Sequence, residues 1–165
     1  SNPENIAPGL MQQAVNVDFS TQNAETRGGF VCLPELGAQP FGTNWNLKTV
    51  APTTTWNAVA YGNGLYVAVG VLATGYGTVM TSLDGINWTV QTVASAPAFN
   101  DVAYGNGKFV IVGDGGKAVF SEDNGLTWKK AITNTTNDLN AIAYGPQLKK
   151  FVAVGNKRTI VTVNG

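Results

Sequence analysis

The stretch Asn100-Asp101-Val102-Ala103-Tyr104-Gly105 decides the fold of this chain, because versions of it occur three times. The related stretches begin at Asn57 and at Asn140, so the tyrosine within them recurs after 43 and then 40 residues. A set of tryptophans keeps the same spacing: Trp45, Trp88 and Trp128. A period near 40 residues indicates an array of similar structural units rather than one irregular domain.

The repeats are built from short strand-like runs. In the middle repeat we expect strands over 99–104, 108–113, 117–121 and 126–131. The Asn-Gly pair between the first two runs favours a tight hairpin, since both residues accept positive φ. The second run has apolar residues on both of its faces, which predicts a central strand that is covered on both sides. The fold class predicted is therefore all-β, with four-stranded antiparallel blades of the β-propeller type.

The chain has 165 residues, enough for one such array with a substantial core. Residues 1–41 are expected to form an N-terminal arm and a degenerate β unit, and residues 42–165 three repeats with boundaries near 85 and 125. Thr162–Gly165 lines up with Ser82–Gly85. Either residues 45–50 supply the outer strand that the last blade would need, or this is an early piece of a longer array, so the ring is incomplete or completed by a partner.

One turn in each of the first two repeats carries a recognisable motif. Ser121-Glu122-Asp123-Asn124-Gly125-Leu126-Thr127-Trp128 fits S-x-D-x-G-x-T-W in full, and Ser82-Leu83-Asp84-Gly85-Ile86-Asn87-Trp88 is one residue shorter. An Asp carboxylate at this place can accept backbone N–H groups across a turn, and a Gly can take the left-handed conformation.

These motifs resemble the Asp box of the BNR-type repeat family, which includes sialidases and many other propellers. The resemblance covers roughly residues 42–165. It implies that the box is a structural turn away from any active site. The residues given this structural role are Ser82, Asp84, Gly85, Trp88, Ser121, Asp123, Gly125 and Trp128.

Composition argues against catalysis. The chain has no histidine, which removes His-based acid–base chemistry and the commonest zinc sites. Sialidases clamp their substrate with three arginines, and this chain has two, Arg27 and Arg158. No pair of carboxylates stands out as a glycosidase pair. We therefore expect no enzyme, no catalytic residue, no metal and no cofactor.

The charges say little about charged partners. Ten basic and ten acidic residues give a formal net charge of zero, so we expect neither nucleic acid nor a membrane surface as partner. Only 12% of the residues are charged, against about 25% in ordinary globular domains. A surface this low in charge favours burial against neighbouring protein subunits.

Several residues are candidates for binding or for an interface. The repeated asparagines and tyrosines either line one rim and bind a ligand once per blade, or bond and pack against the adjacent blade: Asn57, Asn100, Asn140, Tyr61, Tyr104 and Tyr144. Trp56 lies outside the regular tryptophan spacing and would serve as an interface anchor or as a platform for a sugar.

The N-terminal segment differs in character. The pattern from Asn16 and Asp18 to Arg27, Gly29 and Phe30 resembles the start of some bacteriophage tail-tube, nozzle and head-to-tail proteins. Arg27 either takes part in an interface, as the resemblance implies, or is an ordinary charge at the end of a hairpin.

The leading hypothesis is a non-catalytic structural or interaction protein, a bacteriophage virion component of the tail, nozzle or head-to-tail region in a homo- or hetero-oligomer. One alternative is a secreted or surface propeller that binds glycans or proteins, and another is a fragment of a larger Asp-box glycosidase.

Overall fold

The computed structural model describes residues 26–27, 30–31, 45–48, 54–93 and 97–165. The chain divides into two compact units, Ser1–Leu47 and Lys48–Gly165. In the first unit, β1 (Thr26–Arg27) pairs antiparallel with β2 (Phe30–Val31). The rest of the arm and β unit expected over residues 1–41 lies outside the described residues.

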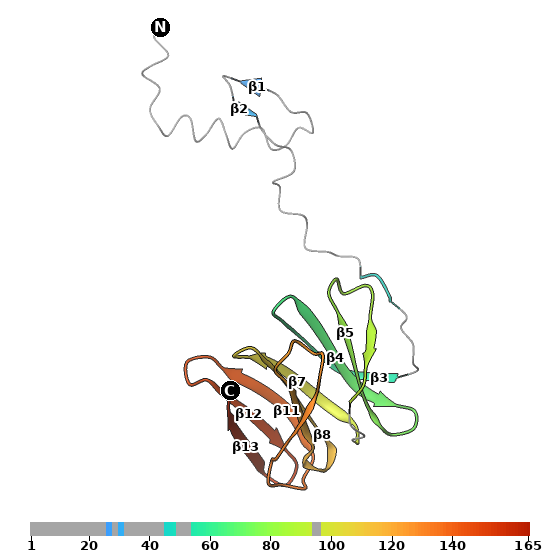
Figure 1. Ribbon diagram of the computed structural model, residues 1–165, viewed down its shortest axis with the longest axis vertical. Coiled ribbons are helices and arrows are strands. Elements are labelled where there is room, and N and C mark those ends of the chain that lie inside the picture. The colour runs from blue at the N-terminus through green and yellow to red at the C-terminus, as the bar shows by residue number, and fades with distance from the viewer. Residues whose placement is uncertain (1–25, 28–29, 32–44, 49–53, 94–96) are drawn as a thin grey trace. The chain divides into compact units, whose positions relative to one another are not determined.

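The second unit consists of three antiparallel sheets whose strands pair in chain order (Figure 1). The first sheet contains β3 (Thr54–Gly62), β4 (Leu65–Leu72), β5 (Gly77–Ser82) and β6 (Thr89–Gln91). The middle sheet contains β7 (Phe99–Gly105), β8 (Lys108–Gly113), β9 (Ala118–Ser121) and β10 (Lys129–Ala131), with the 3-10 turn η2 (Asp114–Gly116) between β8 and β9. The third sheet contains β11 (Leu139–Gly145), β12 (Lys150–Gly155) and β13 (Thr159–Asn164). The predicted all-β class with antiparallel blades is confirmed.

The first two hairpins close through the turns expected from their Asn-Gly pairs. Asn63 and Gly64 have φ of 48° and 75°, and Asn106 and Gly107 have φ of 46° and 77°. Positive φ at both central residues matches the right-handed twist of the flanking strands, so each turn favours the pairing of the two strands that it joins. The third hairpin lacks the Asn-Gly pair and uses the longer loop that follows Gly145.

The core lies between the sheets. Val67 and Val69 of the first sheet pack in one buried cluster with Phe109 and Ile111 of the middle sheet. The alternate residue Val112 faces the other way and packs in a second cluster against the third sheet. Both faces of β8 are therefore buried, as its sequence predicts, because alternate residues of a strand point to opposite faces.

Two expectations about the third sheet fare differently. Residues 45–48 form no strand, and 49–50 lie outside the described residues, so the third sheet has three strands in the part of the chain that the structure describes. The alignment of Thr162 with Ser82 is wrong by one residue. Ser82 faces Tyr66 across its sheet, and the equivalent partner Phe151 faces Val163 instead. The pairing register of β13 depends on the length of the loop before it. The alignment of Thr162 with Ser82 matched two hydroxyl side chains and took no account of that length.

Within the described part of the chain, no helix is both long and apolar enough to cross a membrane.

Candidate functional site

The turn at residues 82–88, called here the Ser82 turn, is organised around one carboxylate. Asp84 Oδ1 accepts the backbone N–H groups of Ile86 and Asn87, each at 2.8 Å, and Asp84 Oδ2 accepts the Asn87 side-chain amide at 2.8 Å. Ser82 Oγ accepts the Gly85 N–H at 2.9 Å, while its hydroxyl donates to Asp84 at 3.0 Å. Gly85 has φ of 71°, which a side chain would strain. The turn satisfies its own donors.

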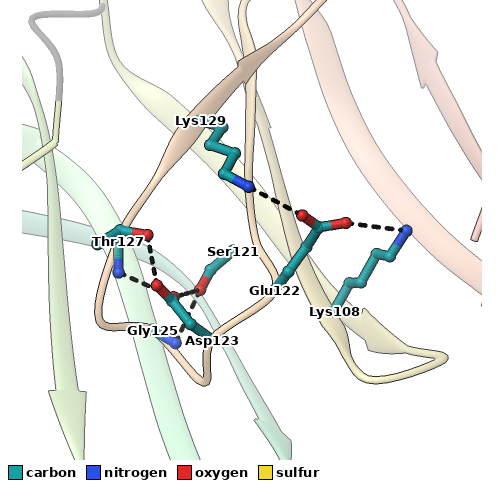
Figure 2. Close-up of polar contacts among 7 residues, drawn as sticks. All are labelled: Lys108, Ser121, Glu122, Asp123, Gly125, Thr127 and Lys129. Carbon is teal, nitrogen blue, oxygen red and sulfur yellow. Dashed lines mark hydrogen bonds and ion pairs between the residues drawn. The ribbon is translucent and has the colours of Figure 1, made fainter.

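The turn at residues 121–128, the Ser121 turn, repeats this arrangement with one more residue (Figure 2). Asp123 Oδ1 accepts the Thr127 N–H at 2.9 Å, and Asp123 Oδ2 accepts the Thr127 hydroxyl. The Ser121 hydroxyl donates to Asp123 at 2.8 Å and its oxygen accepts the Gly125 N–H at 2.8 Å. Ser121 is buried, so its hydroxyl holds the turn onto the end of β9.

The tryptophans that end the two turns differ in their polar contact. Trp88 Nε1 donates to the Gly85 carbonyl at 3.3 Å. Trp128 Nε1 is buried and finds no hydrogen-bond partner among the described residues. The Trp128 ring packs against the cluster between the first and middle sheets. The extra residue of the longer turn thus costs one indole contact while the ring keeps its apolar packing.

The carboxylates of both turns are held in their ionised form. Hydrogen bonds from the Thr127 side chain, the Thr127 N–H and Ser121 lower the pKa of Asp123 to about 2. The backbone N–H groups of Asn87 and Ile86 lower the pKa of Asp84 well below its usual range. A carboxylate that accepts several N–H bonds is stabilised in its charged form.

A neighbouring acid is held by two cations. Glu122 lies between Lys129 and Lys108, with Nζ–Oε distances of 3.1 Å and 3.3 Å (Figure 2). The hydrogen bonds from Lys129 and Lys108 lower the pKa of Glu122. This exposed cluster links β8 to β10, the second and fourth strands of the middle sheet.

The described residues offer no cluster of three His, Cys, Asp or Glu side chains that would hold a metal ion. The oxygens of Asp84 and Asp123 accept hydrogen bonds from donors of their own turns. In these two turns the geometry serves local structure.

The repeated asparagines connect neighbouring sheets. Asn57 Nδ2 donates to the Phe99 carbonyl of the middle sheet at 2.7 Å, and Asn100 Nδ2 donates to the Leu139 carbonyl of the third sheet at 3.0 Å. Each asparagine lies where the pairing register shifts by one residue, that is, in a β-bulge. A bulge re-aims a side chain, and here it directs the amide towards the next sheet.

The third asparagine, Asn140, lies at the same kind of register shift. Among its described residues, the second unit has no sheet beyond the third, and the Asn140 amide donates to Asn156 Oδ1 at 2.9 Å on the exposed surface. One further bond joins the middle and third sheets, since Asp101 Oδ2 accepts the Ile142 N–H at 2.7 Å.

Two of the three repeated tyrosines, Tyr104 and Tyr144, pack between sheets, whereas Tyr61 is exposed. Each of the three contacts an aromatic residue of its own sheet in a tilted arrangement, with ring centroids 4.5–4.7 Å apart. Tyr104 also lies over Gly62 of the first sheet, and Tyr144 lies over Gly105 of the middle sheet. A Cβ at either glycine would overlap the tyrosine ring, so these two positions require glycine for close approach of the sheets.

The two outer sheets each present an uncovered apolar face among the described residues. The leading face is the side of the first sheet that carries Val59, Tyr61, Tyr66 and Ala68. The trailing face is the side of the third sheet that carries Gly145, Val152, Val154 and Ile160. Val59 and Tyr61 are 62% and 59% exposed, and Ile160 is 68% exposed.

The leading face contains a cavity of about 390 Å³. Its lining includes Trp56, Trp88, Met80 and Lys48. Trp56 is half-buried and comes directly before the bulge of β3. The structure thus brings Trp56 and Trp88 to one site and leaves Asn100 and Tyr104 inside a sheet-to-sheet contact. Arg27 lies in β1 of the other unit. The leading and trailing faces were not predicted from the sequence, although the repeats show which residues are equivalent in the inner and outer sheets.

Comparison with known proteins addresses the fold. No protein-family model matches the chain. No curated protein matches it. Among solved structures, it is similar to "YCF48 bound to D1 peptide", with a TM-score of 0.58 and 18% sequence identity over 74% of this chain. The chain spans 41% of the length of that structure's chain. YCF48 is a β-propeller, so the similarity supports a propeller-type all-β fold.

Proposed function

We propose that this chain is a non-catalytic interaction module. Its sheets bind other proteins and so join the chain to a larger assembly. The observation that carries the proposal is the exposure of the leading and trailing faces. Val59 is 62% exposed, whereas the equivalent Val102 of the middle sheet is 5% exposed. Ile160 is 68% exposed, whereas the equivalent Ala118 is 6% exposed. Contiguous apolar patches of this kind mark protein interaction sites.

Two further observations support a protein partner. The low charged content of the chain suits burial against neighbours. In the similar structure YCF48 is bound to a peptide, and we propose that this chain too binds protein segments. Membership of the Asp-box repeat family belongs to the same proposal and rests on the geometry of the Ser82 and Ser121 turns.

The absence of catalysis is also part of the proposal. It is supported by the two carboxylates at Asp84 and Asp123, whose low pKa and saturated hydrogen bonding leave them no proton to give near neutral pH. The arginine content supports it as well, because the sequence has two arginines and sialic acid recognition in sialidases uses three.

A narrower form of the proposal places the chain in a bacteriophage virion. Its support is the sequence resemblance near Arg27, most of which lies outside the described residues. Mapping the subunits of purified particles by mass spectrometry tests this form. A chain that never copurifies with particles would remove the virion assignment and leave the interaction module in place.

The general proposal is tested by the native mass of the chain in extracts of its source. We expect the chain in a defined complex, of one or more kinds of protein subunit, that cross-linking preserves. A free monomer that is never cross-linked to any protein, or one that hydrolyses a sialoside, would contradict the interaction module.

The cavity beside Trp56 favours a second candidate, a surface or secreted module that binds glycans. Two tryptophans beside an apolar hollow are a suitable platform for a sugar ring, which stacks on aromatic faces. A glycan array compared with the Trp56→Ala variant tests it. Binding that the substitution abolishes would support this candidate, and an array without any binding would remove it.

A further inference from the structure

One kind of contact occurs twice inside the chain. A tyrosine of the following sheet fills the hollow over a glycine of the preceding sheet, as Tyr104 does at Gly62 and Tyr144 at Gly105. At both contacts the asparagine of the preceding sheet donates to the first carbonyl of the following sheet. Two independent copies of the same geometry define what this sequence repeat recognises: another copy of itself.

The trailing face carries the glycine and the asparagine that the preceding sheet supplies to this contact, and no tyrosine covers the glycine among the described residues. A Cβ at Gly145 would meet only the Lys150 carbonyl oxygen, at 3.7 Å, so the hollow over Gly145 is open among the described residues. Asn140, the matching donor, is bonded to exposed Asn156. Val152 and Val154 are 38% and 43% exposed, although their equivalents in the first two sheets are at most 6% exposed.

The leading face carries the groups that the following sheet supplies to this contact, a tyrosine and a carbonyl acceptor. Tyr61 is the counterpart of Tyr104 and Tyr144, contacts the Tyr66 ring in the same tilted arrangement, and is 59% exposed. The acceptor is also present. Phe99 pairs with Gly113 just before its bulge, and Trp56 pairs with Gly70 just before the equivalent bulge, so the Trp56 carbonyl stands where the Phe99 carbonyl accepts Asn57.

We propose that the trailing face of one copy of this chain binds the leading face of a second copy, head to tail. In this contact Tyr61 of one copy fills the hollow over Gly145 of the other, and Asn140 donates to the Trp56 carbonyl. The contact continues the stacking of sheets already seen twice within one chain, and Val152 and Val154 take up the role that Val67 and Val69 have against the middle sheet. This inference deepens the proposed function by naming the partner.

Such a contact joins two different faces, so it is heterologous. It gives a closed ring if the rotation per copy closes and a filament if it does not. In a ring every copy buries both faces and no apolar face is left to solvent, which is the arrangement we expect for a soluble oligomer.

The test uses two variants of the whole chain. Gly145→Leu blocks the trailing face, and it fits the fold because the hollow is empty in the chain itself. Tyr61→Asp places a charge on the leading face at an exposed position. We expect the wild-type chain to form an oligomer by light scattering and native mass spectrometry, and each variant alone to be a monomer with a thermal midpoint close to that of dilute wild type. Thr89→Leu, which adds the same side chain on the exposed outer strand β6, is the control and keeps the oligomer.

Mixing the variants gives the decisive result. Gly145→Leu retains a working leading face and Tyr61→Asp a working trailing face, so an equimolar mixture forms a one-to-one dimer and nothing larger. A mixture that stays monomeric, variants that associate like wild type, or a wild-type chain that is monomeric at all concentrations would overturn the inference. This last result leaves the proposed function standing if the monomer is still cross-linked to a different protein, and removes both if it is not.

A face covered by the chain's own residues 1–53 is a distinct outcome. It would appear as a wild-type monomer in which Tyr61 is protected from hydroxyl-radical labelling, and it would overturn head-to-tail binding.

Discussion

Substituting Gly105 by alanine tests how closely the sheets approach each other. The added methyl group would overlap the ring of Tyr144 at the atoms nearest its own backbone. The ring has little freedom to move aside, because it packs against the Phe151 ring with centroids 4.7 Å apart. The middle and third sheets must therefore separate locally. Overpacking of this kind costs about 1–3 kcal/mol.

A second effect opposes this cost. Replacing glycine by alanine restricts the unfolded chain and contributes about 0.4–1 kcal/mol of stability where the native backbone accepts alanine. We therefore expect Gly105→Ala to lower the free energy of unfolding by about 1–2 kcal/mol. For a unit of this size, each kcal/mol lowers the thermal midpoint by about 2–8 °C.

The matched control is Gly145→Ala, at the same position of the next repeat. There the added Cβ meets only a carbonyl oxygen at 3.7 Å. We expect a change within about 0.5 kcal/mol in dilute samples. Urea unfolding followed by tryptophan fluorescence measures both variants. A Tyr144→Ala background removes the overlap, so Gly105→Ala should become nearly neutral there. Equal midpoints for Gly105→Ala and Gly145→Ala in dilute samples would refute the reasoning.

Three further outcomes are expected. Asn100→Ala, which removes the bond to the Leu139 carbonyl and a second one to Asp114 Oδ1 at 2.8 Å, should cost about 1–3 kcal/mol in urea unfolding, whereas Asn140→Ala should stay within about 0.5 kcal/mol; equal losses would contradict the bridging role. The pKa of Asp123 is lowered on folding to about 2, so the contribution of its carboxylate to stability is complete above about pH 4 and is lost as the pH falls towards 2. Asp123→Asn should lose stability at neutral pH, and its stability, followed by circular dichroism, should fall less steeply at acid pH. An unchanged dependence on acid pH would count against the assignment. Glu122→Gln should lower the thermal midpoint at low ionic strength and leave it nearly unchanged in about 1 M salt, because exposed ion pairs are screened; a salt-independent difference would mean that Glu122 acts by another route.

Much of this fold follows from periodicity. The recurrence of the Asn-to-Gly stretch, the Asn106-Gly107 turn and the apolar run of β8 each depend on local sequence, and local physics is enough to predict them. The Ser82 and Ser121 turns belong to the same class, since every bond in them joins residues a few positions apart.

The features that escaped prediction depend on register between strands. The bulges that direct Asn57 and Asn100 towards the next sheet arise from a one-residue shift in pairing, which the sequence does not display. The same reason explains Val163, which occupies the position assigned to Thr162. The leading and trailing faces are visible only when equivalent residues in inner and outer sheets are compared for burial.

The stacking of the sheets also sets the order in which the unit comes apart. Among the described residues, the middle sheet alone packs on both faces, so it shares in two clusters while each outer sheet shares in one. In a one-dimensional array, stability is a sum of each unit's own term and its nearest-neighbour terms. The outer sheets therefore open first and independently of each other, and the amides of β8 exchange with solvent last. Loosening β8 alone would uncouple the two outer sheets, although neither has changed.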